Sequence, residues 1–160
     1  MPWQVFDHTA DLGLRVEAAS REALFEEAGR ALTALIVEEP EAAVRTRERL
    51  DVALTASDPA DLLFDWLHAL LVAFEVRHLL LVRFAIEIVG TGEDEDRGEI
   101  VGLDEAGVGE GDLRLRGRAW GERVDPARHR LVHEVKAITY HGLWLGRQGA
   151  GWAAEVIVDV

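Results

Sequence analysis

The clearest folding signal in the sequence is the stretch DPADLLFDWLHALLVAFEVR at residues 58–77. Asp58 is a residue type that caps helix N-termini, and Pro59 suits the first helical position, where no N–H is needed. The apolar residues that follow recur at helical spacing: Leu62, Leu63, Trp66, Leu67, Leu70, Leu71 and Phe74. Because they form one broad apolar face, we predict a helix over about 58–77 that covers a sheet.

A second helix is predicted over about 20–37. Ser20 is a good N-cap residue, and Glu22 lies in the first turn, where the helix dipole favours a negative charge. The apolar residues of this segment also recur at helical spacing: Leu24, Ala28, Ala31, Leu32 and Leu35. The chain therefore contains two main helices, one in each half of the sequence.

The segments on either side of these helices alternate between apolar and polar residues, which is typical of strands with one buried face. The predicted strands lie at about 3–6, 12–16, 50–55, 82–88, 113–116, 135–140, 143–145 and 152–158. Two helices and roughly seven strands, with long strand-to-strand runs, indicate an α+β fold. We expect a single domain over residues 1–160, a two-layer sandwich of mostly antiparallel or mixed sheet with the two helices.

A change of composition interrupts the strand pattern at about 90–112. Residues 90–111 contain seven of the fifteen glycines, and residues 93–112 contain nine acidic residues against the single base Arg97. We interpret this segment as a solvated acidic loop or hairpin within the same domain. Asp94 and Asp96 do not make a calcium loop, because Gly98 stands where that loop needs an oxygen ligand.

The composition excludes several classes of protein. The chain has 160 residues, 49% of them hydrophobic, and no cysteine. It is long enough for a real core and has no disulfide, thiolate metal site or cysteine nucleophile. A formal net charge of −13 argues against a surface that grips nucleic acid unaided, since phosphate binding needs a basic footprint. The longest apolar-rich stretch, 62–84, carries too many charges to span a membrane, so we expect a cytoplasmic protein without membrane contact.

Several catalytic motifs are missing from the sequence. It contains no glycine-rich phosphate loop followed by Lys-Ser/Thr, no Gly-x-Gly-x-x-Gly and no Gly-x-Ser-x-Gly. The only serines, Ser20 and Ser57, lie at or just before predicted helix starts. A serine hydrolase is therefore not expected.

Two carboxylates stand at predicted strand ends. Asp159 follows the buried-looking run Val156-Ile157-Val158, and Asp11 begins an alternating segment. If their strands are neighbours, Asp11 and Asp159 can share a hard divalent cation with oxygen ligands. The alternative is that each is an ordinary capping or solvated residue. His8, three residues before Asp11, fits either a metal or acid–base site or a histidine that bonds a backbone group.

Lys136 is the only lysine in a chain with sixteen arginines. Lysine is a compact point charge with a tunable pKa, whereas arginine spreads its charge over a planar fork. In strand alternation Lys136, Ile138 and Tyr140 share one face, and His141 follows directly. This mixture of residues suits a surface that binds a partner as well as it suits a catalytic surface.

The sequence resembles the archease family along its whole length. The resemblance rests on HTADLG at 8–13, LLFDWL at 62–67, EVKAITYHG at 134–142 and VIVDV at 156–160. Gly121-Glu122, Asp125-Pro126 and His129 also resemble the segment that precedes the family's lysine motif. The acidic segment at 93–112 is longer and more acidic than we expect of the family.

The resemblance implies a non-catalytic protein cofactor rather than an enzyme. Archeases assist the RtcB-type tRNA-splicing ligase, which seals RNA using GTP and manganese, and they promote its guanylylation and repeated turnover. By motif position, the metal ligands are Asp11, Asp159 and an oxygen of Val160, with calcium usual in the family and manganese or magnesium possible. Lys136 is then the activating residue, and Tyr140, His141 and His8 belong to the surface that meets the partner.

In this interpretation RNA is reached only through the ligase, in tRNA splicing or RNA repair. Two alternatives stay open. One is a chaperone-like modulator of a tRNA methyltransferase or another RNA-processing enzyme. The other is a small metal-dependent hydrolase that uses Asp11, Asp159 and His141.

Overall fold

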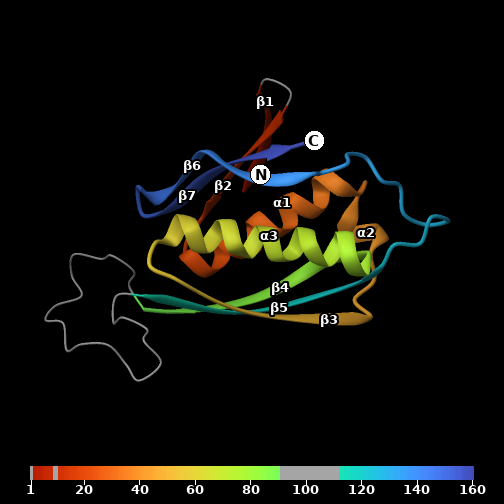
Figure 1. Ribbon diagram of the computed structural model, residues 1–160, viewed down its shortest axis with the longest axis horizontal. Coiled ribbons are helices and arrows are strands. Elements are labelled where there is room, and N and C mark those ends of the chain that lie inside the picture. Colours follow the sequence, from red (N-terminus) through yellow and green to blue (C-terminus); the bar gives the residue numbers. More distant parts are fainter. Residues whose placement is uncertain (1, 9–10, 91–111) are drawn as a thin grey trace, which may run out of the picture.

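The structure is a computed structural model that describes residues 2–8, 11–90 and 112–160. Its described part has seven strands in two antiparallel sheets, with two long helices between the sheets (Figure 1). The order of elements is β1, β2, α1, α2, β3, α3, β4, β5, β6 and β7.

The four-stranded sheet has the order β1-β2-β7-β6 and contains both ends of the chain. Its strands are β1 (Trp3–His8), β2 (Asp11–Ala18), β7 (Gly151–Asp159) and β6 (Ala137–Gln148). The three-stranded sheet has the order β3-β5-β4, with β3 (Glu48–Ala56), β5 (Leu113–Arg123) and β4 (Leu79–Val89). All neighbouring strands are antiparallel.

The two predicted helices are confirmed at nearly the predicted boundaries. α1 (Arg21–Ile36) begins after Ser20, whose hydroxyl accepts a hydrogen bond from the N–H of Ala23. α3 (Pro59–Arg77) begins after Asp58, whose carboxylate accepts from the N–H of Ala60 at 2.7 Å. A short helix, α2 (Pro40–Ala43), follows α1.

The hydrophobic core lies on both sides of the helix layer. Trp66 of α3 is fully buried, and its indole N–H donates to the carbonyl oxygen of Phe25 in α1. The same ring packs edge-on against Phe84 of β4 and lies over Gly117 of β5, where a Cβ atom would come within 2.7 Å of it. The predicted α+β class is confirmed. Because each sheet has its own buried face, the helices form a middle layer between two sheets.

The strand predictions needed correction at β5 and β6. β5, predicted over 113–116, extends to Arg123, and β6 begins at Ala137, so that Lys136 lies just before the strand and not within it. Residues 135–140 and 143–145 were predicted as separate strands, but β6 runs through both. Its register with β7 shifts between Thr139 and Trp144, and Gly142 in this interval has a φ of +66°. A shift of this kind breaks the alternation of side chains, so one irregular strand has the sequence pattern of two. The acidic segment predicted at about 90–112 falls almost wholly outside the described residues.

None of the helices formed by the described residues is both long enough and apolar enough to span a membrane.

Candidate functional site

Neighbouring strands bring the predicted carboxylates together at one end of the four-stranded sheet. Asp11 of β2 lies opposite Asp159 of β7, His8 of β1 lies opposite Asp11, and Ala137 of β6 lies opposite Asp159. The condition set by the sequence, that the strands carrying Asp11 and Asp159 are neighbours, is therefore met. We call these four residues the carboxylate row.

Both carboxylates lie on the outer face of this sheet, away from the helices. Leu14 and Val158 are buried in the core between the sheets. Because side chains alternate along a strand, Asp11 and Asp159 point to the opposite face. Both residues are half-buried, so the row is accessible at the surface.

The paired carboxylates suit a hard divalent cation. Like charges that face each other across two strands destabilise the sheet, and their Cβ atoms are about 5 Å apart. One cation with a preference for oxygen ligands can touch both carboxylates and remove the repulsion. Among the described residues no three or more His, Cys, Asp or Glu side chains form a metal cluster. Among the described residues a further oxygen can come from the half-buried Val160, which directly follows Asp159.

Lys136 is attached to the carboxylate row through its main chain. The main-chain N–H of Lys136 donates to the carbonyl oxygen of Asp159 at 2.7 Å, and Lys136 is exposed to solvent. The segment before it is anchored to the end of α1, where the N–H groups of Val132 and His133 donate to carbonyls of the last helical turn. These bonds satisfy helix-end carbonyls that have no partner within the helix. They also fix the path of the chain toward Lys136.

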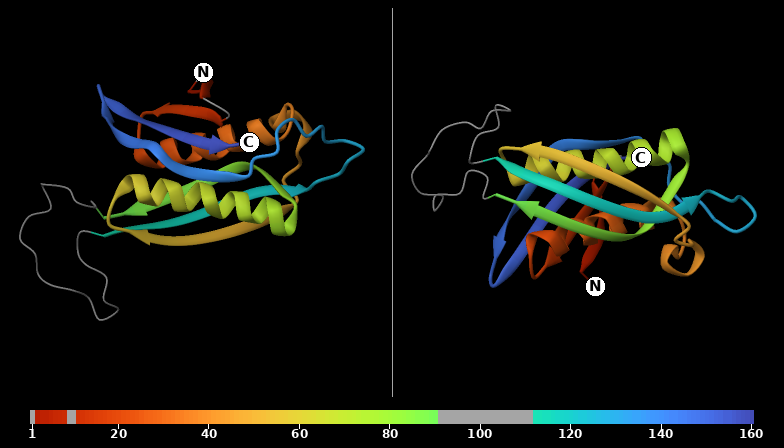
Figure 2. Two further views of the ribbon diagram at one scale, coloured as in Figure 1. Left: turned by 45° about the horizontal axis from the view of Figure 1, so that its top comes forward. Right: turned by 90° about the horizontal axis from the view of Figure 1, so that it is seen from below.

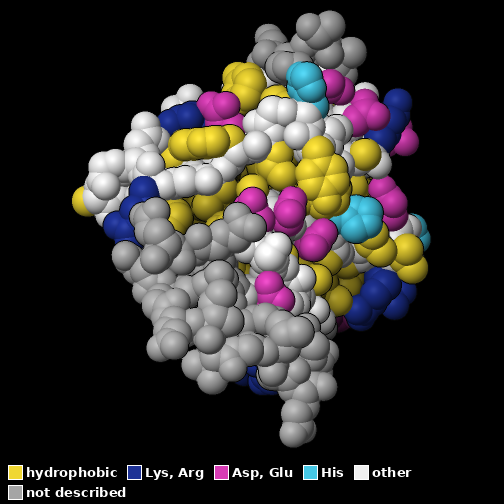
Figure 3. Space-filling model, turned by 60° about the vertical axis from the view of Figure 1, so that its left-hand side comes forward, with side chains coloured by type: hydrophobic (Ala, Val, Ile, Leu, Met, Phe, Trp, Pro, Cys, Tyr) yellow, Lys and Arg dark blue, Asp and Glu magenta, His cyan; other side chains and the backbone are white. Residues whose placement is uncertain are grey.

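Tyr140 belongs to a different surface, on the side of β6 that meets α3. Its ring stacks on Phe64 with centroids 3.9 Å apart and an interplanar angle of 13°. Tyr140 is nevertheless 59% exposed. Partial desolvation and the negative charges of Asp65 and Asp61 raise the pKa of its hydroxyl. Figure 3 shows acidic side chains gathered next to hydrophobic and histidine side chains on this side of the molecule.

His141 is exposed and is not part of the carboxylate row. It lies four positions beyond Ala137 along β6, which corresponds to roughly 13 Å of strand. Of the two histidines singled out by the sequence, only His8 is paired by register with Asp11. The combination of Asp11, Asp159 and His141 that a hydrolase would use is therefore not assembled by the strand register.

The outer face of the same sheet carries a polar network that sequence reasoning missed. Arg15 donates to Glu155 at 2.9 Å and to Gln148 at 2.7 Å. Its guanidinium also lies 6.0 Å from the centre of the Trp144 ring. Alternation along β2 places Arg15 on the outer face, but its hydrogen-bond partners are 140 and 133 residues away in the sequence. Only the sheet order could have identified them.

A second missed cluster surrounds Glu122, a buried carboxylate of β5. Arg128 donates to it at 2.7 Å, the N–H of Arg45 at 2.8 Å, and His129 approaches it at 3.1 Å. Burial by itself raises the pKa of Glu122, but these hydrogen bonds and the charge of Arg128 outweigh it and lower the pKa to about 2. The carboxylate is thus held ionised inside the protein.

The hydrogen bonds of His129 define its tautomer. The N–H of Asp125 donates to Nδ1 at 2.8 Å, so Nδ1 carries no proton. We therefore assign the proton to Nε2, which lies 3.1 Å from both a Glu122 carboxylate oxygen and the carbonyl oxygen of Ala43. A neutral His129 in this form ties the turn after β5 to the end of α2.

Fold and site together define a small α+β protein of two antiparallel sheets, with a pair of carboxylates facing each other at the end of one sheet. The chain belongs to the archease family, because a sequence model of the archease protein family matches residues 3–160. The resemblance found in the sequence motifs is thereby confirmed along almost the whole chain.

Curated relatives support the same conclusion. The chain is 34% identical to protein archease of Methanopyrus kandleri over 160 residues, which is 100% of both chains. It is 32% identical to protein archease of Methanosarcina mazei over 158 residues, covering 99% of this chain and 95% of that one. Both alignments therefore extend over at least 99% of this chain.

Solved structures agree with the fold. The solution structure of Methanobacterium thermoautotrophicum protein 1598 has a TM-score of 0.72 and 26% identity, and 99% of each chain is covered. The crystal structure of an archease from Thermotoga maritima, described as a possible chaperone, has a TM-score of 0.52 and 19% identity over 98% of this chain and 96% of that one. The second likeness shows the fold alone.

Proposed function

We propose that this protein is a non-catalytic accessory factor that activates an RtcB-type RNA ligase and binds a divalent cation for that purpose. The observation that carries the proposal is the carboxylate row, in which Asp11 lies opposite Asp159. Next to the row, the main-chain N–H of Lys136 donates to the carbonyl oxygen of Asp159. Family membership supports the choice of partner, because the archease family is associated with this ligase. Activation promotes metal-dependent guanylylation and repeated turnover of the ligase.

Asp11, Asp159 and an oxygen of Val160 would hold the cation. Their oxygens fit calcium, magnesium or manganese, and the bound ion supplies positive charge at a point where two carboxylates otherwise repel. The ligand set is too small to fill the coordination sphere of such an ion. It therefore leaves positions for water or for groups of the partner at the surface of the protein.

Lys136 provides the second element of this surface. Its ammonium is a point charge with three donors, and it suits a phosphate or a carboxylate of the ligase–nucleotide complex. The anchored segment before it and the hydrogen bond to Asp159 keep its main chain next to the carboxylates. We propose that cation and Lys136 act on the partner as one patch.

Tyr140, His141 and His8 extend the proposed partner surface beyond this patch. Tyr140 exposes most of its ring while it rests on Phe64, so a partner can bury it without a rearrangement of α3. Large aromatic side chains of this kind often dominate the binding energy of an interface. The net charge of −13 fits a basic RNA-holding partner and predicts association that slows as salt rises.

The test is multiple-turnover RNA sealing by the RtcB-type ligase of the same organism at limiting manganese. We expect the wild type to raise turnover, and both Asp11→Asn and Lys136→Ala to abolish the rise. Asp51→Asn, which removes an exposed carboxylate from the other sheet, is the matched control and should activate fully. Failure of the wild type to stimulate a competent ligase, or full activation by Asp11→Asn, contradicts the proposal.

Lys136→Arg separates two roles of the lysine. If only positive charge is required, the arginine variant activates like the wild type. If a compact ammonium is required, as we propose, it activates poorly, because the guanidinium is larger and planar.

The second candidate function is a chaperone-like modulator of a tRNA methyltransferase or another RNA-processing enzyme. The description of the Thermotoga maritima archease as a possible chaperone favours keeping this candidate. A chaperone-like modulator would protect or retarget a methyltransferase in the absence of any ligase. The same variants distinguish it, because protection by a general hydrophobic surface is insensitive to Asp11→Asn.

A further inference from the structure

The three-stranded sheet has an outer face that no described helix or strand covers (Figure 2, right). The central strand β5 alternates between buried residues such as Leu115 and three exposed arginines. Arg114, Arg116 and Arg118 therefore stand in a line along the middle of this face, about 6.6 Å apart along the strand. We call this surface the arginine face.

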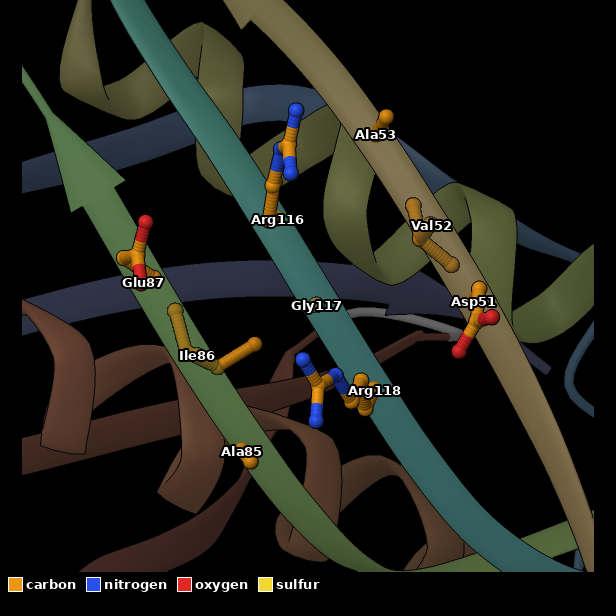
Figure 4. A pocket seen from close by; sticks show the side chains of 9 residues that line it. All are labelled: Asp51, Val52, Ala53, Ala85, Ile86, Glu87, Arg116, Gly117 and Arg118. Carbon is orange, nitrogen blue, oxygen red and sulfur yellow. The ribbon is translucent and has the colours of Figure 1, made fainter.

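Figure 4 shows the middle of the arginine face, where a hollow of about 620 Å³ lies over β5. In the strand register Arg118 has Asp51 of β3 on one side, and Arg116 has Glu87 of β4 on the other. Neither guanidinium forms an ion pair with a described residue. In Figure 4 the guanidinium of Arg118 lies on the side of β5 away from Asp51, and that of Arg116 lies along β5, away from Glu87. Their charge is thus presented to solvent.

The next row of the same face places an aromatic ring between two more arginines. Trp120 of β5 lies opposite Arg49 of β3 and opposite Arg83 of β4. Trp120 is half-buried, and both arginines are exposed. Arg49 also contacts Asp51 at 3.1 Å, as an exposed ion pair that is weak in water.

This face is locally basic in an acidic protein. Among its described residues, Arg49, Arg83, Arg116 and Arg118 have Asp51 and Glu87 as the acidic residues at the outer positions of the three strands, whereas the whole chain has a net charge of −13. The total charge therefore conceals a basic footprint of the kind that phosphate groups require. The expectation that this protein reaches RNA only through a partner rested on that total.

We propose that the arginine face binds single-stranded RNA directly. A line of arginines on an open strand can follow a phosphate backbone, and a tryptophan beside it offers a flat surface on which a base stacks. An acidic peptide would also be attracted by the arginines, but it has no base to place on Trp120. Binding is weak and tolerant of sequence, because phosphate contacts carry no sequence information.

The test is fluorescence anisotropy of a labelled oligoadenylate of about 12 nucleotides at an ionic strength of about 20 mM. Arg116→Gln/Arg118→Gln should weaken binding about tenfold and reduce the slope of log K against log salt by about 1.4, or 0.7 for each lost phosphate contact. Arg77→Gln/Arg130→Gln removes the same charge from exposed positions outside the face and should change affinity less than about twofold. Equal losses in the two double variants would overturn the proposal.

Substitutions of Trp120 separate RNA from other polyanions. Trp120→Leu should weaken oligoadenylate binding by about fivefold or more, whereas Trp120→Phe, which keeps a ring, should retain most of it. Neither should affect binding of inorganic polyphosphate. If Trp120→Leu binds oligoadenylate like the wild type, or if polyglutamate binds as tightly as RNA and competes for the same arginines, an acidic protein is the partner and the RNA proposal is wrong.

The experiment contains no ligase. Its outcome is therefore independent of the accessory role proposed above, and failure of either proposal leaves the other standing.

Discussion

Glu122 and Asp159 are both carboxylates at the C-terminal end of a strand, yet their surroundings are opposite. Glu122 is the next-to-last residue of β5 and is buried, and Arg128, the Arg45 N–H and His129 all contact it. Asp159 ends β7 at the surface, half-exposed, and faces the carboxylate of Asp11 across the strand pair. The charge of Glu122 is compensated by donors of the chain, whereas Asp159 lies across the strand pair from a second carboxylate.

The contrast distinguishes a carboxylate that stabilises the fold from carboxylates that we propose bind a cation. A buried carboxylate surrounded by donors is stable as it stands, and its removal weakens the fold. Two carboxylates in direct opposition cost stability, and an external cation is the simplest way to recover it. The Glu122 cluster therefore supports the fold, whereas for the Asp11–Asp159 pair we propose a role in binding a cation.

The largest expected effect comes from removing the charge of Glu122, which the chain compensates. Glu122→Gln leaves the Arg45 N–H without its charged acceptor and removes one of the two carboxylates that Arg128 contacts. We expect a loss of about 3 kcal/mol in the free energy of unfolding. Denaturant titration at neutral pH measures it. Glu87→Gln, which removes an exposed glutamate from β4, is the control and should change stability by less than about 0.5 kcal/mol.

The same cluster predicts a pH dependence of stability. The pKa of Glu122 is lowered to about 2 from 4.5, so its charge stabilises the fold fully above pH 4.5. This contribution is lost as the pH falls from about 4.5 toward 2, because the unfolded chain then binds the proton first. Glu122→Gln should flatten the stability curve in this window. An unchanged acid dependence would show that other carboxylates dominate it.

An intermediate effect is expected when a cation is supplied to the Asp11–Asp159 pair. Calcium at a hundred times its dissociation constant should stabilise the wild type by about 2.7 kcal/mol, which corresponds to roughly 5–10 °C in melting temperature. Asp159→Asn should lose this response, and Asp51→Asn should keep it. Equal calcium responses in the two variants would place the binding site elsewhere in the chain.

The smallest effect concerns the repulsion itself. With all divalent ions removed by chelator, Asp159→Asn should be more stable than the wild type by about 0.5 kcal/mol, because one of two opposed charges is gone. Salt should shrink the gain, since partly exposed charges are screened. A variant less stable than the wild type under these conditions would mean that a donor from the chain already compensates Asp159.

Local features of the fold were predictable from the sequence. Ser20 and Asp58 marked the two helix starts, and apolar spacing gave both helix lengths within a few residues. The alternation of β2 and β7 indicated their buried faces. What could not be predicted was the division of the strands between two sheets, because alternation reports which residues are buried and not against which layer they pack.

The same distinction applies to the candidate site, where residue types could be predicted from the sequence but contacts between distant segments could not. Asp11, Asp159 and Lys136 stood out as residue types at strand ends. The structure places Asp11 opposite Asp159 and joins the main-chain N–H of Lys136 to the carbonyl oxygen of Asp159. The stack of Tyr140 on Phe64 could not be foreseen, because it joins segments far apart in the chain. The arginine face was hidden for a different reason: net charge sums over the whole chain and carries no information about which face a charge lies on.

The most direct test of the central claim is a titration of the protein with manganese, in which free Mn²⁺ is followed by electron paramagnetic resonance. We predict one tight site in the wild type and in Asp51→Asn, and binding at least about tenfold weaker in Asp11→Asn and Asp159→Asn. Weak binding to acidic segments elsewhere is common to all four proteins and does not alter the comparison. Tight binding that survives both substitutions would contradict the assignment of the carboxylate row as the cation site.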